Sequence, residues 1–190
     1  MRVMKAILVG TAMLAAAPTQ SAMTVLGSGQ ARECYLAAEL DTSASRRDGM
    51  VICSRALIEE ALSQRDRAAT FVNRGILNMR AKSIDAAIRD YDAALRAQPG
   101  LAEAFVNKGI ALLHKGDEEA AVQMLTAGID RNPARPEVAY YSRGVAHELL
   151  GKLKEAMGDY RQAATLAPKW DEPAKQLERF KVVSSETKAG

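Results

Sequence analysis

The chain repeats one pattern of residues three times at a nearly constant interval. Gly75, Gly109 and Gly144 occupy one slot of this pattern, and their two intervals differ by a single residue. An alanine follows each glycine at a fixed distance along the sequence, and a proline that ends the copy follows each alanine at that same distance. A period of roughly 34 residues is typical of proteins built from stacked repeats, because one unit cannot bury its apolar face alone. The sequence therefore predicts three repeats, over residues 68–101, 102–135 and 137–170.

The spacing of apolar residues inside each copy predicts two helices. In the first copy, apolar side chains recur every three or four residues over 68–80 and again over 84–96, which places them on one face of a helix. Ser83 and Asp117 stand before the second helices of two copies and are expected to cap them. With 48% hydrophobic but only 5% aromatic residues, the composition favours closely packed helices over a β-sandwich.

The three glycines recur inside helical patterns, where a glycine costs ~1 kcal/mol relative to alanine. Their recurrence in one slot implies that two helix backbones approach each other closely there. We expect side chains of the neighbouring unit to contact each glycine. A phosphate-binding loop is disfavoured, because these glycines are not clustered between a strand and a helix.

The same slots resemble the tetratricopeptide repeat (TPR), a helix–turn–helix unit with this period. The matching residues are Phe71, Gly75, Ala87, Tyr91 and Pro99, then Phe105, Gly109, Ala121 and Pro133, then Tyr140, Gly144, Ala156, Tyr160 and Pro168. Leu125 replaces one aromatic residue of the family pattern, and Arg74, Lys108 and Arg143 replace its leucine, which should turn that slot toward solvent. The resemblance implies an all-α fold: a right-handed superhelical stack of helix-turn-helix hairpins with a C-terminal capping helix.

Weaker patterns flank the three copies. Residues 30–66 fit a degenerate first hairpin, with helices over 30–40 and 49–62 and a polar connection between them. Apolar residues over 170–181 fit a helix that caps the last repeat. The remaining expected boundaries are 23–29 for a linker, 30–182 for the whole TPR domain and 183–190 for a disordered tail.

Residues 1–22 have the pattern of a cleaved signal peptide. Arg2 and Lys5 precede an uncharged apolar run over 6–17 that is too short to span a bilayer, and small residues follow near Ala22. A buried N-terminal helix is the alternative. Leader, cysteines and repeats together resemble a group of small exported bacterial proteins, which implies a periplasmic or secreted location. No later stretch is long and apolar enough for stable membrane insertion.

The charge of the chain gives no reason to expect nucleic acid as a partner. Without Arg2 and Lys5, the 26 basic residues fall to 24 against 23 acidic residues, which leaves a charge near +1. Basic and acidic residues are also interspersed along the chain. Binding to nucleic acid through bulk charge therefore lacks support.

Cysteine and histidine usage indicates a structural bond and no catalytic motif. Two cysteines in an exported chain suggest a disulfide between Cys34 and Cys53, across the first hairpin, although buried free thiols are the alternative. The two cysteines lack metal-site or redox spacing. His114 and His147 lie in different repeats and different slots, and no motif supports catalysis by them. We therefore expect neither a metal, nor another cofactor, nor an enzyme.

The family resemblance implies a concave groove, lined by the first helices of the repeats, that receives a peptide or partner segment. By slot, the groove residues are Asn73, Ile76, Met79 and Arg80, then Asn107, Ile110, Leu113 and His114, then Ser142, Val145 and Glu148. Asn73 and Asn107 could donate to and accept from the backbone of an extended peptide, or could instead bridge neighbouring helices.

The function expected from these features is a non-catalytic protein–protein interaction scaffold or adaptor of the bacterial cell envelope. The alternative is an accessory or regulatory subunit of an envelope enzyme or assembly complex.

Overall fold

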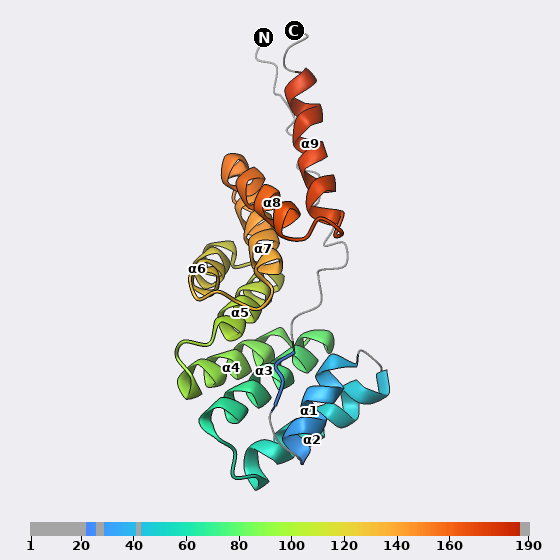
Figure 1. Ribbon diagram of the computed structural model, residues 1–190, viewed down its shortest axis with the longest axis vertical. Helices are drawn as coiled ribbons and strands as arrows, with labels where there is room; N and C mark the ends of the chain where they lie inside the picture. The colour runs from blue at the N-terminus through green and yellow to red at the C-terminus, as the bar shows by residue number, and fades with distance from the viewer. Residues whose placement is uncertain (1–21, 26–28, 41–42, 187–190) are drawn as a thin grey trace.

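A computed structural model describes residues 22–25, 29–40 and 43–186, and the ordered elements in these ranges are nine α-helices (Figure 1). The helices are α1 (Gln30–Glu39), α2 (Ser43–Glu59), α3 (Gln64–Arg80), α4 (Ile84–Ala97), α5 (Ala102–Lys115), α6 (Glu118–Ile129), α7 (Pro136–Leu149), α8 (Leu153–Leu166) and α9 (Glu172–Glu186). Among them, none has the length and apolar character needed to cross a membrane.

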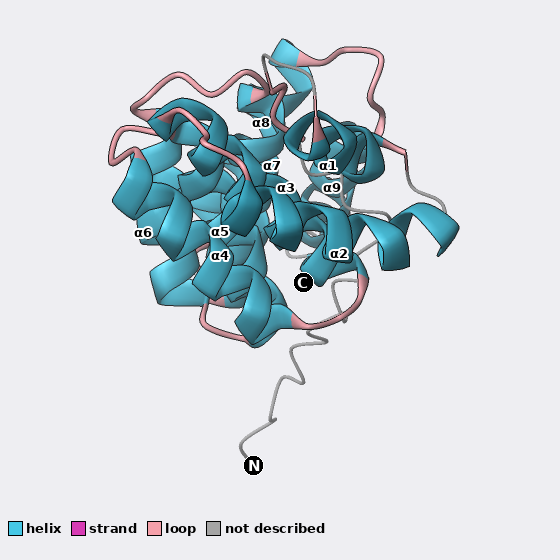
Figure 2. Cartoon of the chain, turned by 90° about the horizontal axis from the view of Figure 1, so that it is seen from below, coloured by secondary structure: helices cyan, strands magenta, loops and turns pink. Residues whose placement is uncertain are grey.

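Consecutive helices pack as hairpins, and the hairpins stack in chain order. The tightest packing joins α1 to α2, α3 to α4, α5 to α6 and α7 to α8, while α2, α4 and α6 each also contact the first helix of the next hairpin. Figure 2 shows the same described ranges as helices joined by short loops. The predicted all-α stack of hairpins is confirmed.

Each slot glycine lies against a large side chain of its own hairpin. A Cβ added at Gly75 would lie 2.5 Å from Tyr91 Cε1, and one at Gly144 would lie 2.8 Å from Tyr160 Cε1. The expectation that the neighbouring unit contacts these glycines is therefore wrong. The two helices of one hairpin approach closely because the aromatic ring of the second helix rests on the bare backbone of the first.

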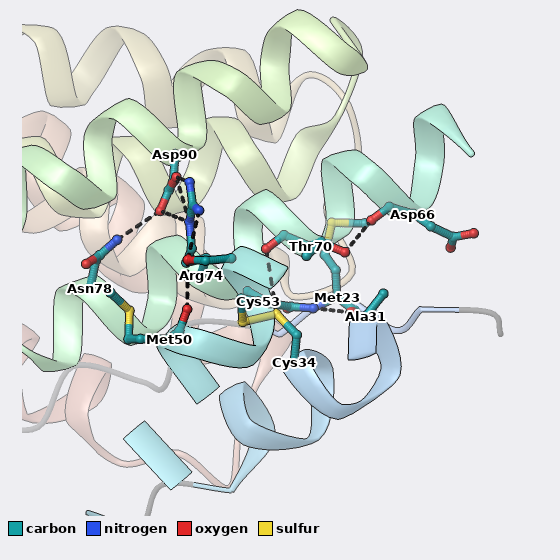
Figure 3. The surroundings of a disulfide bond; sticks show 12 residues. Met23, Ala31, Cys34, Met50, Cys53, Asp66, Thr70, Arg74, Asn78 and Asp90 are labelled. Carbon is teal, nitrogen blue, oxygen red and sulfur yellow. Dashed lines mark hydrogen bonds and ion pairs between the residues drawn. A yellow bond between two sulfur atoms is a disulfide. The ribbon is translucent and has the colours of Figure 1, made fainter. Parts of the chain in front are cut away.

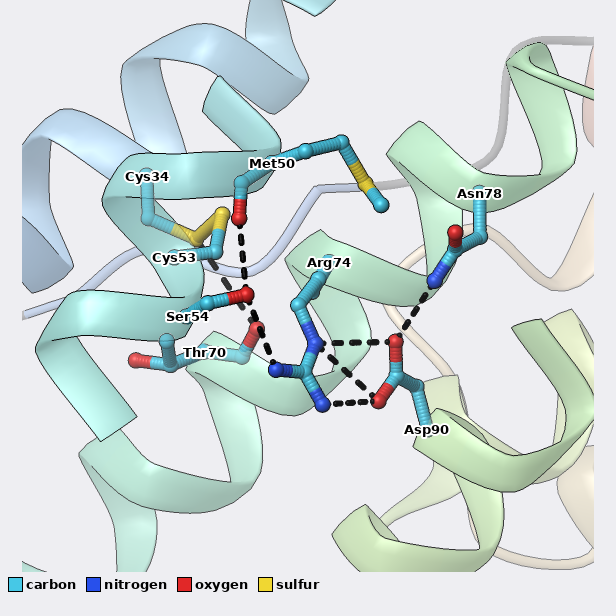
Figure 4. A network of polar contacts seen from close by, with 8 residues as sticks. All are labelled: Cys34, Met50, Cys53, Ser54, Thr70, Arg74, Asn78 and Asp90. Atoms are coloured by element: carbon cyan, nitrogen blue, oxygen red, sulfur yellow. Dashed lines mark hydrogen bonds and ion pairs between the residues drawn. A yellow bond between two sulfur atoms is a disulfide. The ribbon is translucent and has the colours of Figure 1, made fainter. Parts of the chain in front are cut away.

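The cationic slot, the position directly before each glycine that holds Arg74, Lys108 or Arg143, is partly buried. This finding corrects the expectation that the slot turns toward solvent. Arg74 donates to Asp90 on α4 with an Nη2–Oδ1 distance of 2.6 Å, and its Nη1 donates to Ser54 Oγ on α2 (Figure 4). The Arg143 and Asp159 side chains form the equivalent pair in the last hairpin. These ion pairs join the two helices of a hairpin, and the Arg74–Ser54 bond also reaches the preceding one.

Two helices begin earlier than expected, and one expected N-cap does not form. α2 begins at Ser43, so part of the expected connection is helical. α3 begins at Gln64, where Ser63 Oγ accepts a hydrogen bond from the Asp66 backbone N–H. Ser83 stands at the N-cap of α4 but its side chain caps nothing, whereas Asp117 accepts from the Ala120 N–H as expected.

The first hairpin packs against α3 and is held by a disulfide between α1 and α2. The Cys34 and Cys53 Cα atoms are 4.8 Å apart, and both side chains are fully buried beside Leu77 of α3 (Figure 3). Two apolar residues of α2 do not join this core as their spacing suggests, because Val51 is 58% exposed and Ile58 is 83% exposed.

Helix α9 covers the end of the stack. Trp170, Leu177 and Phe180 pack against the core of the last two repeats. The helix continues to Glu186, so the tail expected from residue 183 is helical at its start, and residues 187–190 lie outside the described ranges. The predicted leader likewise falls outside them up to residue 21.

Candidate binding groove

The residues predicted to line a groove all lie on α3, α5 and α7, the first helices of the three clear repeats. These helices contact one another directly, α3 with α5 and α5 with α7. The slots that the repeat period relates, such as Asn73 and Asn107, therefore follow one another along one face of the stack.

Most apolar members of the predicted set belong to the hydrophobic core. Ile76, Ile110, Leu113 and Val145 are all buried, each within one of the two large hydrophobic clusters. Met79 is half-buried against the cluster around α3 and α4. These side chains contribute to the packing of the stack, and their assignment as groove contacts stays a prediction.

Two charged members of the predicted set are engaged inside the protein. Arg80 Nη1 donates to the Ala38 carbonyl oxygen at 2.7 Å, which ties α3 to α1. Glu148 accepts from the Tyr160 hydroxyl at 2.8 Å and from Arg179 of α9 at 2.9 Å. Both residues therefore stabilise the stack.

The two histidines do not form a catalytic arrangement with each other. His114 lies on the surface at the end of α5, and partial burial of its ring lowers its pKa. His147 Nδ1 lies 3.0 Å from Asp159 Oδ2, a carboxylate that also pairs with Arg143. Within the described residues, no group of three or more His, Cys, Asp or Glu side chains could hold a metal ion.

Asn73 is fully buried and holds the backbone of a segment 50 residues away. The Met23 backbone N–H donates to Asn73 Oδ1 at 2.7 Å, and Asn73 Nδ2 donates to the Met23 carbonyl oxygen at 2.8 Å. One side-chain amide thus satisfies both backbone groups of one residue. This is the pairing expected of an asparagine that recognises extended chain.

The segment that Asn73 holds, residues 22–25, is not helical and lies on the first helices. Val25 is 3% exposed and packs with Ala31, Ala56 and Ala69. Met23 contacts the same cluster as well as the core around α3 and α4. The linker expected over 23–29 therefore begins, over 23–25, as a packed part of the molecule.

Asn107 occupies the same slot one repeat later and has no such occupant. The residue is 2% exposed, and its Nδ2 atom is buried without a hydrogen-bond partner among the described residues. A buried amide nitrogen left unpaired costs about 1–3 kcal/mol. Within the described part of the chain, the donor capacity of Asn107 Nδ2 is thus unused.

A hollow opens beside Asn107, between α5 and the start of α7. Its enclosed part has a volume of only about 10 Å³, which is room for about one water molecule, and the rest is open to solvent. The hollow is lined by Glu103, Val106, Asn107, Pro133, Arg135 and Val138. Glu103 Oε1 accepts from the Ala134 N–H, and Arg135 Nε donates to Glu137. The walls therefore combine apolar surface with one acidic and one basic side chain.

The remaining predicted groove residue, Ser142, is buried on α7 in the third repeat. Sequence reasoning misses both the segment held by Asn73 and the ion pairs of the cationic slot. One signal for the segment is present in the sequence: Met23 and Val25 alternate with Thr24, the pattern of a segment with one buried face.

Comparisons with known proteins agree with the repeat architecture. Two family models, both described as tetratricopeptide repeat, match residues 72–136 and 138–170. No curated protein matches the sequence.

Solved structures with the same fold come from several sources. The first TPR of Spaghetti (RPAP3) bound to HSP90 peptide SRMEEVD is 24% identical, with a TM-score of 0.60 over 65% of this chain and 96% of that chain. The Arabidopsis OM64 TPR domain is 26% identical, with a TM-score of 0.57 over 61% and 94%. MamA from Desulfovibrio magneticus RS-1 is 19% identical, with a TM-score of 0.67 over 87% and 90%.

Proposed function

The chain belongs to the tetratricopeptide repeat family, and from this premise we propose that it is an exported, non-catalytic scaffold that binds an extended segment of a partner protein at Asn107. A single observation carries the proposal. Asn73 already holds both backbone groups of Met23, and Asn107, in the same slot, has an amide Nδ2 with no partner among the described residues, beside a small hollow. One related fold, the first TPR of Spaghetti, was solved with a bound peptide.

The bound segment would pair its backbone with the Asn107 amide as Met23 does with Asn73. Backbone pairing selects for an extended conformation and tolerates many sequences, while the residues that line the hollow determine which side chains of the segment are preferred. Val106, Pro133 and Val138 offer apolar contact surface around the hollow, and Glu103 with Arg135 offers one charge of each sign.

The experiment is capture of a partner from envelope extract by the immobilised protein, followed by affinity measurement on the recovered partner. Asn107→Ala should weaken binding at least tenfold, since loss of a buried hydrogen-bond partner costs about 1–3 kcal/mol and about 1.4 kcal/mol is tenfold. Gln123→Ala, on the exposed side of α6, is the matched control. Equal affinity of the Asn107→Ala variant, with helicity intact, would refute the assignment.

Export is the second part of the proposal. A cut after Ala22 would make Met23, the residue that Asn73 holds, the first residue of the mature chain. The disulfide between Cys34 and Cys53 fits an oxidising compartment. N-terminal sequencing of protein from the native compartment should begin at Met23, and non-reducing mass spectrometry should recover the linked peptide. Two alkylatable thiols in that material would count against export.

A further inference from the structure

The segment 22–25 lies on the stack as a bound peptide would, although it belongs to the same chain. Its two hydrogen bonds to Asn73 come from the backbone of Met23, and its apolar side chains face the helices. Thr24 between them is exposed. The segment therefore shows what kind of ligand this subsite accepts.

The contacts of this segment reach across three clusters of the N-terminal half. Ala22 packs beside the disulfide, Met23 on the core of the first clear repeat, and Val25 on α1, α2 and α3. The amide of Asn73 is the polar anchor of these contacts. Because α1 begins at Gln30, the segment is tethered within a few residues of its site.

A short tether gives a ligand an effective concentration on the order of millimolar, so an internal segment competes strongly with a free one. We propose that residues 23–25 are an internal competitor, hereafter the strap, that fills the Asn73 subsite and is displaced when a partner segment extends from Asn107 to Asn73. This inference rests on the proposed function, since it concerns the same groove.

The chemistry of the strap also defines the segment that replaces it. Such a segment presents one residue whose N–H and C=O both meet the Asn73 amide. It has an unbranched apolar side chain in the place of Met23 and a second apolar side chain two positions later, in the place of Val25. A residue between them can be polar, because Thr24 faces outward.

The test uses the full chain and a fluorescein-labelled peptide with the sequence of residues 20–27, Gln-Ser-Ala-Met-Thr-Val-Leu-Gly. Val25→Asp places a carboxylate among Ala31, Ala56 and Ala69 and should release the strap. Met23→Gly is a second release variant that adds no charge: it removes the apolar side chain and makes the backbone more flexible. Thr24→Asp is the matched control, because it adds the same charge at an exposed position.

The labelled peptide should bind Val25→Asp and Met23→Gly at least tenfold more tightly than it binds the unmodified protein or Thr24→Asp. Apparent affinity rises when the competent state becomes more populated. Adding Asn73→Ala to Val25→Asp should remove the gain. A peptide N-methylated at its methionine amide should show no such gain in affinity, since the corresponding amide of the strap donates to Asn73 Oδ1.

Two results would overturn the inference. One is equal peptide affinity for the unmodified protein and both release variants. The other is loss of cooperative unfolding in both release variants, which would make the segment a fixed part of the core. The proposed function is judged separately by Asn107→Ala: if that variant captures its partner normally while the peptide gains affinity in the release variants, the strap stands and the Asn107 assignment falls.

Discussion

Tyr91 lies so close to Gly75 that a Cβ on the glycine would come within 2.5 Å of Tyr91 Cε1. Gly109 has Leu125 in the same relationship, with Cγ at 2.6 Å. The glycine of the first helix and the large residue of the second are therefore one packing unit. This pairing explains why both recur at a fixed interval, and why leucine can stand where an aromatic residue is usual.

Replacing Gly75 with alanine should destabilise the protein by about 1–3 kcal/mol, the usual penalty for overpacking a core. The Tyr91 ring that blocks the new methyl group is fully buried and cannot move aside cheaply. Gly158→Ala is the matched control: Gly158 lies inside α8, and a Cβ added there would meet nothing within 4 Å, so alanine should stabilise by about 0.5–1 kcal/mol. Urea unfolding measures both, and equal changes of the same sign would contradict the explanation.

The hairpins can be predicted from sequence because the residues that define each hairpin lie within one repeat. Gly75 and Tyr91 lie within one unit, and the repeat shows the relationship three times. The cationic slot is harder to place, because the slot alone does not reveal its partner. Asp90 and Asp159 follow their partners Arg74 and Arg143 at the same distance along the sequence. A methionine stands at that distance after Lys108, and Lys108 pairs instead with Asp92 on α4.

The candidate site is predictable only in part. The family's groove points to Asn73 and Asn107, and one of them does hold a backbone segment. The identity of that segment is not predictable, because Met23 is 50 residues from Asn73 and lies beside a glycine-containing stretch that looks like a linker. Burial of the Ile76 slot follows from stacking between hairpins, which the sequence of one repeat does not reveal.

Asp159 is the anion of a buried polar cluster, so its removal should be costly. Its carboxylate pairs with Arg143 at 2.7 Å and meets His147 at 3.0 Å. Asp159→Ala leaves the guanidinium without its counter-charge and should destabilise by about 3 kcal/mol. The control is Asp85→Ala, which breaks an exposed pair with Lys115 and should change little. Similar losses in both variants, measured by thermal unfolding, would show that burial does not set the difference.

Deletion of residues 169–190 should expose the end of the stack. It removes Trp170 and Phe180, whose rings lie 4.8 Å from Tyr141 and 6.2 Å from Tyr160 between centroids. We expect a lower melting temperature and self-association through the uncovered aromatic surface. Deletion of residues 187–190 alone is the control. A monomeric elution profile with an unchanged melting curve would mean that α9 does not act as a cap.

The hydroxyl of Tyr160 should make stability fall at alkaline pH. Burial raises the pKa of this tyrosine, and the Glu148 carboxylate that accepts its hydrogen bond raises it further. The folded protein therefore keeps the proton above about pH 10, where an unfolded tyrosine loses it. Stability contributed by this group is complete below about pH 10 and is lost as pH rises from there toward the higher folded pKa.

The expected slope is up to about 1.4 kcal/mol of unfolding free energy per pH unit for this one proton. Tyr160→Phe should be less stable at pH 8, because Glu148 loses a hydrogen bond, yet should approach the unmodified protein as pH rises past about 10. Urea unfolding of both proteins at intervals between about pH 8 and 11 gives the difference directly, with other alkaline effects common to both. A constant difference across this range would show that Tyr160 ionises alike in the folded and unfolded chain.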